Sequence, residues 1–499
     1  MTTHDKKPNT YLSKTLFMKG LQCHKALYFE KYQPELKVEQ DTDMQLRLAG
    51  GIEAGNYAKG LFPGGVEVPY DGLSHDEQVA MTQQLIAEGT NTIYEAAFFH
   101  DGIFVKLDIL HMGTKGWEMY EVKASNEYKD HYLNDISVQY YVAAGSGLKI
   151  SKAHIVYMNR EYVRKGAIDP KKLFVTENIT GDVKKNQAVI KTKLDEIRKM
   201  LLGDMPVMDI GSHCDDPYEC DFMSHCREHL PDTSVFDLCG SSKIKWELYY
   251  EGHHDMAKLP LDRLEPKQRF QVEAYIGKTE ITDKTVVKQY LNSLTYPLCF
   301  FDFETFQQPV PPFDGTKPYQ KIPFQYSLHV IEEKGAKLNH YEYLAEPGTD
   351  PREEIARGLI SQIPKDATVL VYHKPFETEI LNNFKSWFPK YAKKLDAIID
   401  NIVDLKEPFS QRVAYHWKMQ GSASLKAVLP AFIPEMTYEG MEVSHGGEAQ
   451  EAYFTMQELE DPKGLGRLRK ALLEYCRQDT LAMVRLLEKL EDISKEAGR

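Results

Sequence analysis

Residues 103–123 read IFVKLDILHMGTKGWEMYEVK, and the architecture expected for the first part of the chain follows from this segment. Two apolar runs, 103–110 and 117–123, flank Gly113 and Gly116, which is the pattern of two strands joined by a turn. Helical spacing follows over 131–144, and strand character returns over 153–158. Strand, strand, helix and strand in this order predict an α/β core with acidic side chains on its strands.

The two strands of this stretch present a pair of carboxylates and a lysine. Glu121 and Lys123 alternate along one strand and therefore face the same side, while Asp108 lies on the preceding strand. Carboxylates that converge in this way can hold one or two Mg²⁺ or Mn²⁺ ions, and the lysine can orient a water or stabilise developing charge. Glu-x-Lys alone is common on exposed strands, but Asp108 on an apolar strand and Gln139-Tyr140-Tyr141 on the next helix favour a site.

A second acidic set begins at LCFFDFE, residues 298–304, which predicts a buried strand. Asp302 and Glu304 alternate on this strand, and Tyr475 and Asp479 are four residues apart on a helix, so each pair shares a face. Glu377 comes after the predicted strand 368–373. Four such acids can hold two metal ions about 4 Å apart, with Tyr475 positioning the water. A lone Asp-x-Glu is more often a solvated strand end, but this order of acids is specific.

The cysteines predict a metal site that joins two distant segments of the chain, which we call the clasp. Cys23 lies on a predicted amphipathic helix over 11–32, and the run Cys214-x5-Cys220-x5-Cys226 comes after a charged helix over 184–202. Seven cysteines, an odd number in a long chain, do not form a disulfide framework pattern, and thiolates at this spacing suit a soft metal. Four cysteines with nearby histidines allow zinc. The histidines that could join a zinc site are His213 and His225. The remaining cysteines, Cys239, Cys299 and Cys476, are interpreted as buried thiols without a ligand.

The composition bounds the class of protein. The chain has 499 residues, which favours two to four domains, and 42% apolar with 27% charged residues is ordinary for globular proteins. A net charge of −13 argues against a passive nucleic-acid coat, although bound divalent cations would supply positive charge to an enzyme. No apolar run approaches the roughly 20 residues of a membrane span, and the start of the chain lacks a signal-peptide pattern. A cytoplasmic protein without membrane contact is expected.

These patterns divide the chain into three segments. Residues 1–230 form an α/β domain with the first acidic set and the cysteines, 231–295 a mostly helical connector, and 296–499 a second α/β domain. Strands are expected over 326–331, 340–344 and 368–373, a helix over 353–363 and a long terminal helix over 465–490.

The first segment resembles the PD-(D/E)XK nucleases of the RecB and AddB type, whose Asp and Glu-x-Lys match Asp108, Glu121 and Lys123. The resemblance implies a restriction-endonuclease-like fold and a Gln/Tyr pair that contacts the site or DNA. Gln139 matches, but Ala143 stands where the family has its Tyr, so Tyr140 or Tyr141 is the alternative. It also implies a further ligand on an early helix over 50–60, where Glu53 stands.

One cysteine far ahead of a C-terminal trio resembles the [4Fe–4S] clasp of AddB and of CRISPR-associated RecB-like exonucleases. This resemblance implies that Cys23, Cys214, Cys220 and Cys226 hold a structural cluster, with zinc as the alternative.

Residues 296–495 resemble the DnaQ-like DEDDy 3′–5′ exonucleases of the ribonuclease-H-like fold. The resemblance assigns Asp302, Glu304, Glu377 and Asp479 to metal-dependent catalysis with Tyr475, although the third acid of the family is usually Asp. Asp404 is a second candidate for a structural or metal role.

Together the two resemblances predict a Mg²⁺- or Mn²⁺-dependent nuclease with two sites, acting on single-stranded DNA or DNA ends in genome maintenance or defence against mobile DNA. An RNA-processing exonuclease is the alternative of the same class, and a nucleic-acid-binding scaffold with a decayed second site is the alternative of another class. No helicase motif is present in the sequence, so unwinding would need a partner protein. The sequence does not indicate an oligomeric state.

Overall fold

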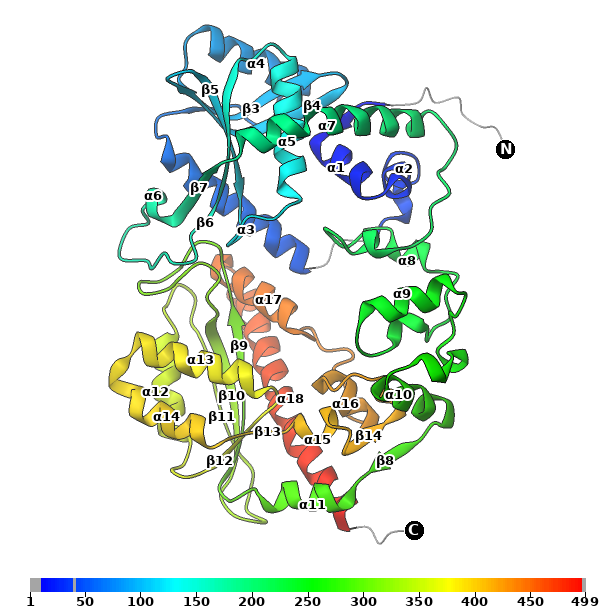
Figure 1. Ribbon diagram of the computed structural model, residues 1–499. Helices are drawn as coiled ribbons and strands as arrows, with labels where there is room; N and C mark the ends of the chain where they lie inside the picture. Colours follow the sequence, from blue (N-terminus) through cyan, green and yellow to red (C-terminus); the bar gives the residue numbers. More distant parts are fainter. Residues whose placement is uncertain (1–9, 39–41, 496–499) are drawn as a thin grey trace. The chain divides into compact units, whose positions relative to one another are not determined.

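The computed structural model describes residues 10–38 and 42–495. The chain divides into two compact units (Figure 1), and both combine sheets with helices in a mixed α/β architecture. Unit 1 consists of residues 1–229 and 308–320, and unit 2 of residues 230–307 and 321–499. The first division lies between residues 229 and 230. The expected connector 231–295 groups with unit 2, and an internal segment of 13 residues groups with unit 1.

A mixed, seven-stranded sheet forms the centre of unit 1. Its strand order is β2-β3-β4-β5-β6-β7, with β1 paired to β4 off this path. Strands β3, β4 and β5 form an antiparallel meander, and β6 is parallel to β5 because a helix connects them. The strands are β1 (Leu12–Ser13), β2 (Val66–Glu67), β3 (Thr92–His100), β4 (Ile103–Gly113), β5 (Gly116–Lys123), β6 (Ile150–Met158) and β7 (Phe174–Asn178).

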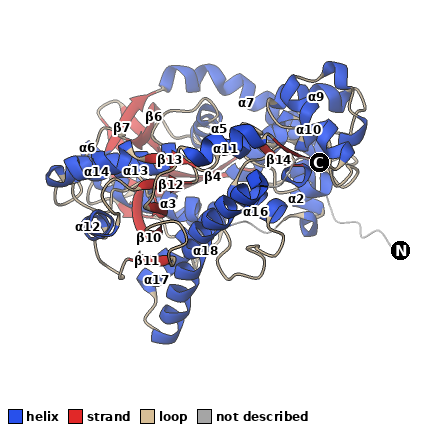
Figure 2. Ribbon diagram, turned by 90° about the horizontal axis from the view of Figure 1, so that it is seen from below, coloured by secondary structure: helices blue, strands red, loops and turns tan. Residues whose placement is uncertain are grey.

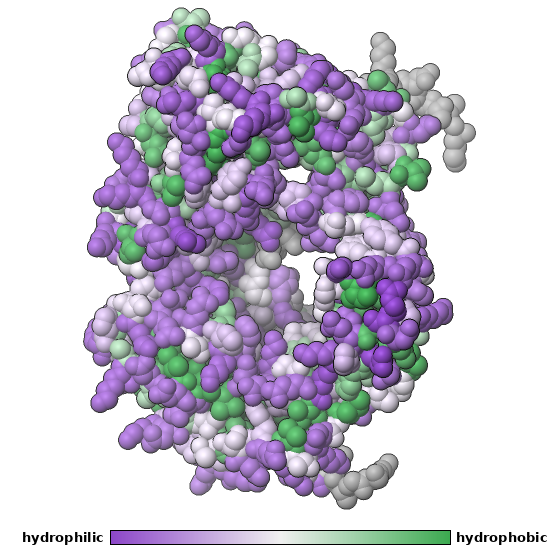
Figure 3. Space-filling view, viewed as in Figure 1, coloured by the Kyte–Doolittle hydropathy of each residue, from purple (hydrophilic) through white to green (hydrophobic). Residues whose placement is uncertain are grey.

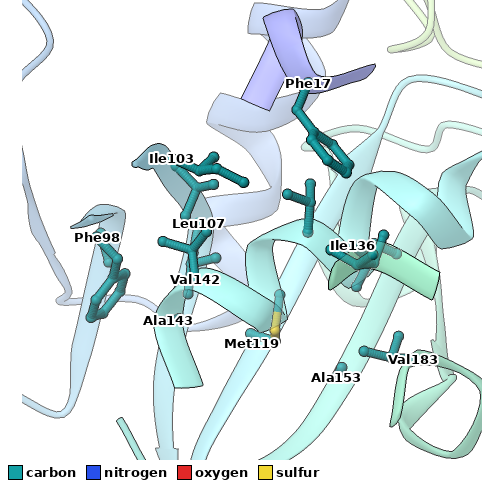
Figure 4. Packing of buried hydrophobic residues seen from close by; sticks show 14 of the residues in the cluster. Phe17, Phe98, Ile103, Leu107, Met119, Ile136, Val142, Ala143, Ala153 and Val183 are labelled. Carbon is teal, nitrogen blue, oxygen red and sulfur yellow. The ribbon is translucent and has the colours of Figure 1, made fainter. Parts of the chain in front are cut away.

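Helices cover both faces of this sheet. Helices α5 and α7 pack on one face around Met119, Ile136, Ala153 and Val183 (Figure 4), and α3 packs on the other face around Tyr120. The alternation of side chains along β5 thus sends Met119 and Tyr120 into two different cores. The helices are α1 (Lys14–Gln22), α2 (His24–Tyr32), α3 (Thr42–Ala58), α4 (His75–Ala87), α5 (Tyr132–Gly145), α6 (Pro170–Leu173), α7 (Thr180–Leu201) and α8 (Met223–Cys226).

Unit 2 is built on a five-stranded sheet of order β11-β10-β9-β12-β13. Strands β9, β10 and β11 are antiparallel neighbours, whereas β12 and β13 run parallel to β9. A separate pair, β8 (Glu280–Thr282) and β14 (Ala414–His416), is antiparallel. The central sheet consists of β9 (Leu298–Phe306), β10 (Ile322–Ile331), β11 (Asn339–Leu344), β12 (Thr368–Val371) and β13 (Ile402–Asp404).

The long helix α18 crosses this sheet and contacts β9 and β10, which places its Tyr475 and Asp479 beside the acids of β9. It is prominent in both ribbon views (Figures 1 and 2). The helices of unit 2 are α9 (Ser242–Tyr250), α10 (Pro266–Gly277), α11 (Lys284–Asn292), α12 (Arg352–Gln362), α13 (Lys374–Trp387), α14 (Ala392–Asp400), α15 (Glu407–Ser410), α16 (Leu425–Phe432), α17 (Gly446–Glu458) and α18 (Pro462–Lys495).

The expected single helix over 11–32 is wrong, because Cys23 interrupts it. Cys23 has an extended backbone (φ −155°, ψ 118°), and its Sγ accepts a hydrogen bond from the Ala26 N–H at 3.4 Å. The thiol therefore caps a new helix, α2, instead of continuing α1. Most other expected elements lie within a few residues of the observed ones, but β3, the partner of β4, was not predicted.

No helix among residues 10–38 and 42–495 is long and apolar enough to cross a membrane. In the space-filling view (Figure 3) hydrophilic residues predominate on the visible face, and hydrophobic ones are scattered among them.

Candidate functional site

Unit 1 gathers three acidic side chains and two lysines on the α5 side of its sheet. We call Asp108 on β4, Glu121 on β5 and Asp135 on α5 the first acidic cluster. The buried Glu121 carboxylate accepts hydrogen bonds from Lys123 Nζ at 2.8 Å and from Lys14 Nζ at 2.9 Å, and the same lysines pair with Asp135. The structure therefore brings Glu121 and Lys123 together as predicted. Lys14 and Asp135 were not predicted.

Burial and charge shape the titration of this cluster. Burial together with the charge of Glu121 raises the pKa of Asp108 well above its usual range. Although burial opposes it, the attraction of Lys14 and Lys123 lowers the pKa of Asp135. Burial likewise favours the neutral form of Lys123, but Glu121 and Asp135 outweigh it and raise the pKa of this lysine. Lys123 thus remains an ammonium and can donate hydrogen bonds or stabilise negative charge, but it does not act as a base.

Gln139 on α5 contacts the first acidic cluster directly. Its Nε2 donates to Glu121 Oε2 at 2.6 Å, while its Oε1 is buried without a hydrogen-bond partner among the described residues. The Oδ2 of Asp108 accepts from the Val122 N–H at 2.6 Å, which ties β4 to β5 at this point. A buried amide oxygen without a partner, beside two carboxylates, provides the oxygen donors that a hard divalent cation prefers.

The two tyrosines predicted to bind substrate lie in different surroundings. The Tyr141 hydroxyl donates to Asp101 at 2.8 Å, in the turn between β3 and β4, so this side chain does not reach the cluster. Tyr140 packs half-buried against the core. Ala143, at the position where the resembled family has Tyr, is fully buried in the same core, which has no room for a phenol there.

Two further acids stand near this region. Glu53, on α3, is half-buried, and burial raises its pKa. Its charge acts on Tyr319, whereas the charges that act on Asp108 are those of Glu121, Lys14, Glu95 and Lys123. Glu95 on β3 was not predicted as a site residue, yet its charge raises the pKa of Asp108. Its backbone has φ +56°, a conformation that is uncommon for a residue with a side chain.

Unit 2 gathers four carboxylates from three elements, which we call the second acidic cluster: Asp302 and Glu304 on β9, Glu377 on α13 and Asp479 on α18. The Glu377 carboxyl shares a hydrogen bond with that of Asp302, and its Oε2 is buried without a partner among the described residues. The charges of Asp479, Glu304 and Glu377 all act on Asp302. The longer side chain of Glu377 therefore reaches the Asp302 carboxyl.

These carboxyls disfavour one another's ionisation. Burial and the neighbouring acids raise the pKa of Asp302 and of Glu304 well above their usual ranges. Burial raises the pKa of Glu377 to about 8 and that of Asp479 to about 6. Crowded, buried acids are costly to stability, and proteins retain such groups mainly at functional sites.

A cavity of about 310 Å³ opens beside the cluster. Its lining includes Asp302, Glu304, Tyr475 and Asp479 as well as Lys406, Ser424 and Lys426. Ligand atoms of Asp302, Glu304 and Cys476 lie within 4.8 Å of one another, the one such group of three or more found in the described part of the chain. A cavity with an acidic wall and two lysines suits a cation together with an anionic ligand.

Two tyrosines flank the acids. Burial and the nearby carboxylates raise the pKa of Tyr475 far above its usual value, so its hydroxyl stays protonated and can both donate and accept a hydrogen bond. The Tyr438 hydroxyl donates a hydrogen bond to Asp479. Tyr438 and Lys426, whose Nζ lies 5.6 Å from both tyrosine rings, come from segments without a site motif in the sequence.

Asp404 has a structural role. Its carboxylate accepts hydrogen bonds from the backbone N–H groups of Lys374 at 3.0 Å and Lys406 at 2.9 Å, and thereby caps the start of α13. Of the two roles that the sequence left open for Asp404, these contacts favour the structural one. By fixing α13, Asp404 also helps to position Glu377.

The four cysteines that were predicted to act as one set of ligands line one small cavity, together with His213, Met208 and Phe222. We call Cys23, Cys214, Cys220 and Cys226 the cysteine cluster. Burial raises the pKa of Cys23 and Cys226 and that of Cys220 to about 11, and the charges of the cysteines act on one another. The backbone N–H of Cys220 donates to Cys214 O at 2.8 Å. Four thiols from distant segments thus converge on one point.

The distances between the four sulfur atoms can be compared with those that a zinc ion would require. Four Zn–S bonds of about 2.3 Å place the sulfurs of a zinc site roughly 3.8 Å apart. No three of these four described cysteines have sulfurs within 4.8 Å of one another. His213 lines the same cavity, whereas His225 pairs with Glu228 at 3.0 Å. The arrangement is wider than a single zinc ion requires.

The fold and the two acidic clusters define a broad class, an α/β protein with two acidic sites in separate units. Residues 299–424 match a family model described as a domain of unknown function, DUF2779, a range that includes Asp302, Glu304 and Glu377 but not Tyr475 or Asp479.

Two curated proteins are similar to part of the chain. The uncharacterized protein MG366 of Mycoplasma genitalium is 23% identical over 269 residues, 50% of this chain and 40% of that protein. Its homolog in Mycoplasma pneumoniae is 26% identical over 265 residues, 49% of this chain and 40% of that protein. The matched region thus spans about two fifths of the length of these relatives.

Proposed function

We propose that the protein is a divalent-metal-dependent nuclease with two hydrolytic sites, one in each unit. The observation that carries the proposal is the second acidic cluster: its four carboxyls converge, and three of them line a cavity of about 310 Å³ together with Tyr475. The strand order β11-β10-β9-β12-β13 supports a ribonuclease-H-like fold, and the meander β3-β4-β5 followed by α5 and β6 supports a PD-(D/E)XK fold.

Asp302, Glu304, Glu377 and Asp479 would hold the metal ions of the second site. Such ions, when bound, supply an acidified water and neutralise charge on the phosphodiester. Tyr438 fixes one oxygen of Asp479 through its hydrogen bond. Tyr475 offers a protonated hydroxyl that can orient a water, and Lys426, which also lines the cavity, would present a positive charge to a phosphate.

In the first site, Asp108, Glu121 and the Gln139 amide oxygen offer the donors for a metal ion, with Glu53 as a further candidate. Lys123 is held by Glu121 and Asp135 in its charged form, so its role is to stabilise negative charge or to orient a water. Lys14 pairs with the same carboxylates and would share them with a cation.

The cysteine cluster is proposed to hold a [4Fe–4S] cluster that links the start of unit 1 to residues 214–226. The separation of the sulfurs and their hydrophobic surroundings, Phe29 and Phe222, support an iron–sulfur cluster over zinc. Its role is structural, because Cys23 and the trio are joined in one unit at a distance of 191 residues in sequence.

DNA, single-stranded or at its ends, is the proposed substrate, in genome maintenance or defence. The test uses labelled single-stranded DNA and RNA of the same sequence at matched salt, with Mn²⁺ and with EDTA. Cleavage of DNA that requires the metal supports the proposal, and cleavage of RNA alone would support the RNA-processing alternative. Binding without cleavage of either polymer would favour a scaffold.

A further inference from the structure

The loop between β9 and β10 contributes residues 308–320 to unit 1. It is fastened to the turn after β6. The Arg164 guanidinium donates to Pro311 O at 2.9 Å and to Pro312 O at 2.6 Å, and the Gly166 N–H donates to Asp314 Oδ1 at 2.7 Å. Three directed hydrogen bonds over a short stretch give this loop a defined position in unit 1.

The loop also packs against α3, the helix that carries Glu53. Val310 is buried in the same hydrophobic cluster as Ala54 and Ala58. A Cβ atom at Gly50 would lie 3.2 Å from Pro309 Cδ, so the helix and the loop approach closely at this glycine. The loop and α3 therefore take their positions together.

Tyr319, near the end of this segment, reaches the end of β5. Its hydroxyl donates to Ala124 O at 2.6 Å, and Ala124 directly follows Lys123. The Tyr319 backbone has φ +56°, which a residue with a large side chain rarely adopts, and its N–H donates to Gln308 O at 2.8 Å. Such strain persists where the surroundings fix the residue, and it is concentrated at functional positions.

The Tyr319 hydroxyl lies within electrostatic range of Tyr132 and Glu53. Burial and the charges of Tyr132 and Glu53 raise the pKa of Tyr319 to about 12, so the group remains a donor near neutral pH. The Tyr132 ring lies 5.3 Å from Lys123 Nζ. The Tyr319 phenol therefore has three neighbours that bear on the first site: the candidate ligand Glu53, Ala124 at the end of β5, and Tyr132, whose ring lies beside Lys123.

We infer that Tyr319 is a positioning residue of the first site: by holding Ala124 O beside α3, it fixes Lys123 and Glu53 relative to each other. This inference rests on the proposed metal site in unit 1. Tyr319 acts through the backbone of Ala124 and is not assigned a catalytic role. Because residues 308–320 group with unit 1, the first site is complete only in a chain that contains this loop.

The test measures Mn²⁺ affinity calorimetrically in the full chain, with Asp302→Asn and Asp479→Asn present so that binding reports the first site. Tyr319→Phe removes the hydroxyl and keeps the ring. Tyr162→Phe is the matched control, because Tyr162 is buried in the same hydrophobic cluster and its hydroxyl accepts a long hydrogen bond, 3.4 Å, from the Asp169 N–H away from the site. Loss of a group that orients a metal site typically weakens affinity about tenfold or more.

A roughly tenfold weaker Mn²⁺ affinity in Tyr319→Phe, with the affinity of Tyr162→Phe unchanged and similar melting temperatures for both, is the expected result. First-site cleavage should then lose kcat and keep its KM for nucleic acid. Equal Mn²⁺ affinity in Tyr319→Phe and the parent overturns the inference, and absence of Mn²⁺ binding in the parent overturns it together with the first metal site. Metal binding that responds to Tyr319→Phe without any cleavage retains the inference and rejects nuclease activity at the first site, because the second acidic cluster is already disabled in this background.

Discussion

Replacement of Glu377 by Gln is expected to stabilise the metal-free protein, and to do so increasingly as the pH rises. Glu377 is 2% exposed, shares a hydrogen bond with Asp302, and has a pKa raised from 4.5 to about 8. The folded state therefore holds a proton that the unfolded chain releases between these values, and the stability of the wild type falls as pH increases from about 4.5 to about 8. Gln keeps the size of the side chain and cannot ionise.

The magnitude is set by the same values. At pH 7 the unfolded chain has lost the proton and the folded protein keeps it. The free energy of unfolding of the wild type falls by about 1.4 kcal/mol for each pH unit between 4.5 and 7, which gives a loss of about 3 kcal/mol as an upper limit. We expect Glu377→Gln to gain up to this amount at pH 7, more at pH 8 and nothing at pH 4.

The assay is urea unfolding in EDTA at pH 5 and pH 8, followed by tryptophan fluorescence, since three of the four tryptophans belong to unit 2. Glu379→Gln is the matched control on the same helix, because Glu379 is half-exposed and pairs with Lys321 at 2.8 Å; it should change stability by less than about 0.5 kcal/mol. Mn²⁺ should stabilise the wild type more than Glu377→Gln. A variant as stable as, or less stable than, the wild type at pH 8 would refute the crowding of these acids.

Three further predictions concern the proposed cysteine-bound cluster, the lysine that lines the cavity and the cap of α13. Cys220→Ser should remove bound iron and lower the melting temperature of unit 1 more than that of unit 2, as seen by metal analysis and calorimetry; equal shifts would contradict the clasp. Lys426→Ala should weaken nucleic-acid binding and reduce its salt slope by about one, whereas the exposed Lys394→Ala should not. Asp404→Ala should cost about 1–2 kcal/mol of stability by urea unfolding, since two backbone N–H groups lose their acceptor; an unchanged midpoint would reject the cap.

The sequence predicted those parts of the sites that lie on regular elements. Alternation along β5 and β9 and the four-residue spacing on α18 placed Glu121, Lys123, Asp302 and Asp479 correctly on their shared faces, because side-chain direction in strands and helices depends directly on residue spacing. The resemblance to the AddB-type iron–sulfur site rests on the order of the cysteines in the chain, one followed far downstream by three. It grouped the same four cysteines that line one cavity.

The missed residues come from distant or irregular segments. Lys14 meets Glu121 across 107 residues of sequence, and Tyr438 meets Asp479 across 41, and neither contact leaves a local pattern. Tyr141 was expected at the first site, but the helix directs it toward Asp101. Hydrophobic residues in the segment 308–320 do not recur with the period of a strand or a helix. Its place in unit 1 therefore depends only on tertiary contacts.

The most direct test of two working sites is cleavage of 5′- and 3′-labelled single-stranded DNA in Mn²⁺ by the wild type, Lys123→Ala and Asp302→Ala. Each variant should lose one set of products and retain the other, because Lys123 and Asp302 belong to separate acidic clusters in separate units. Wild-type cleavage that neither substitution changes would contradict both sites. Cleavage abolished by Lys123→Ala and unaffected by Asp302→Ala would leave the second acidic cluster without a hydrolytic role.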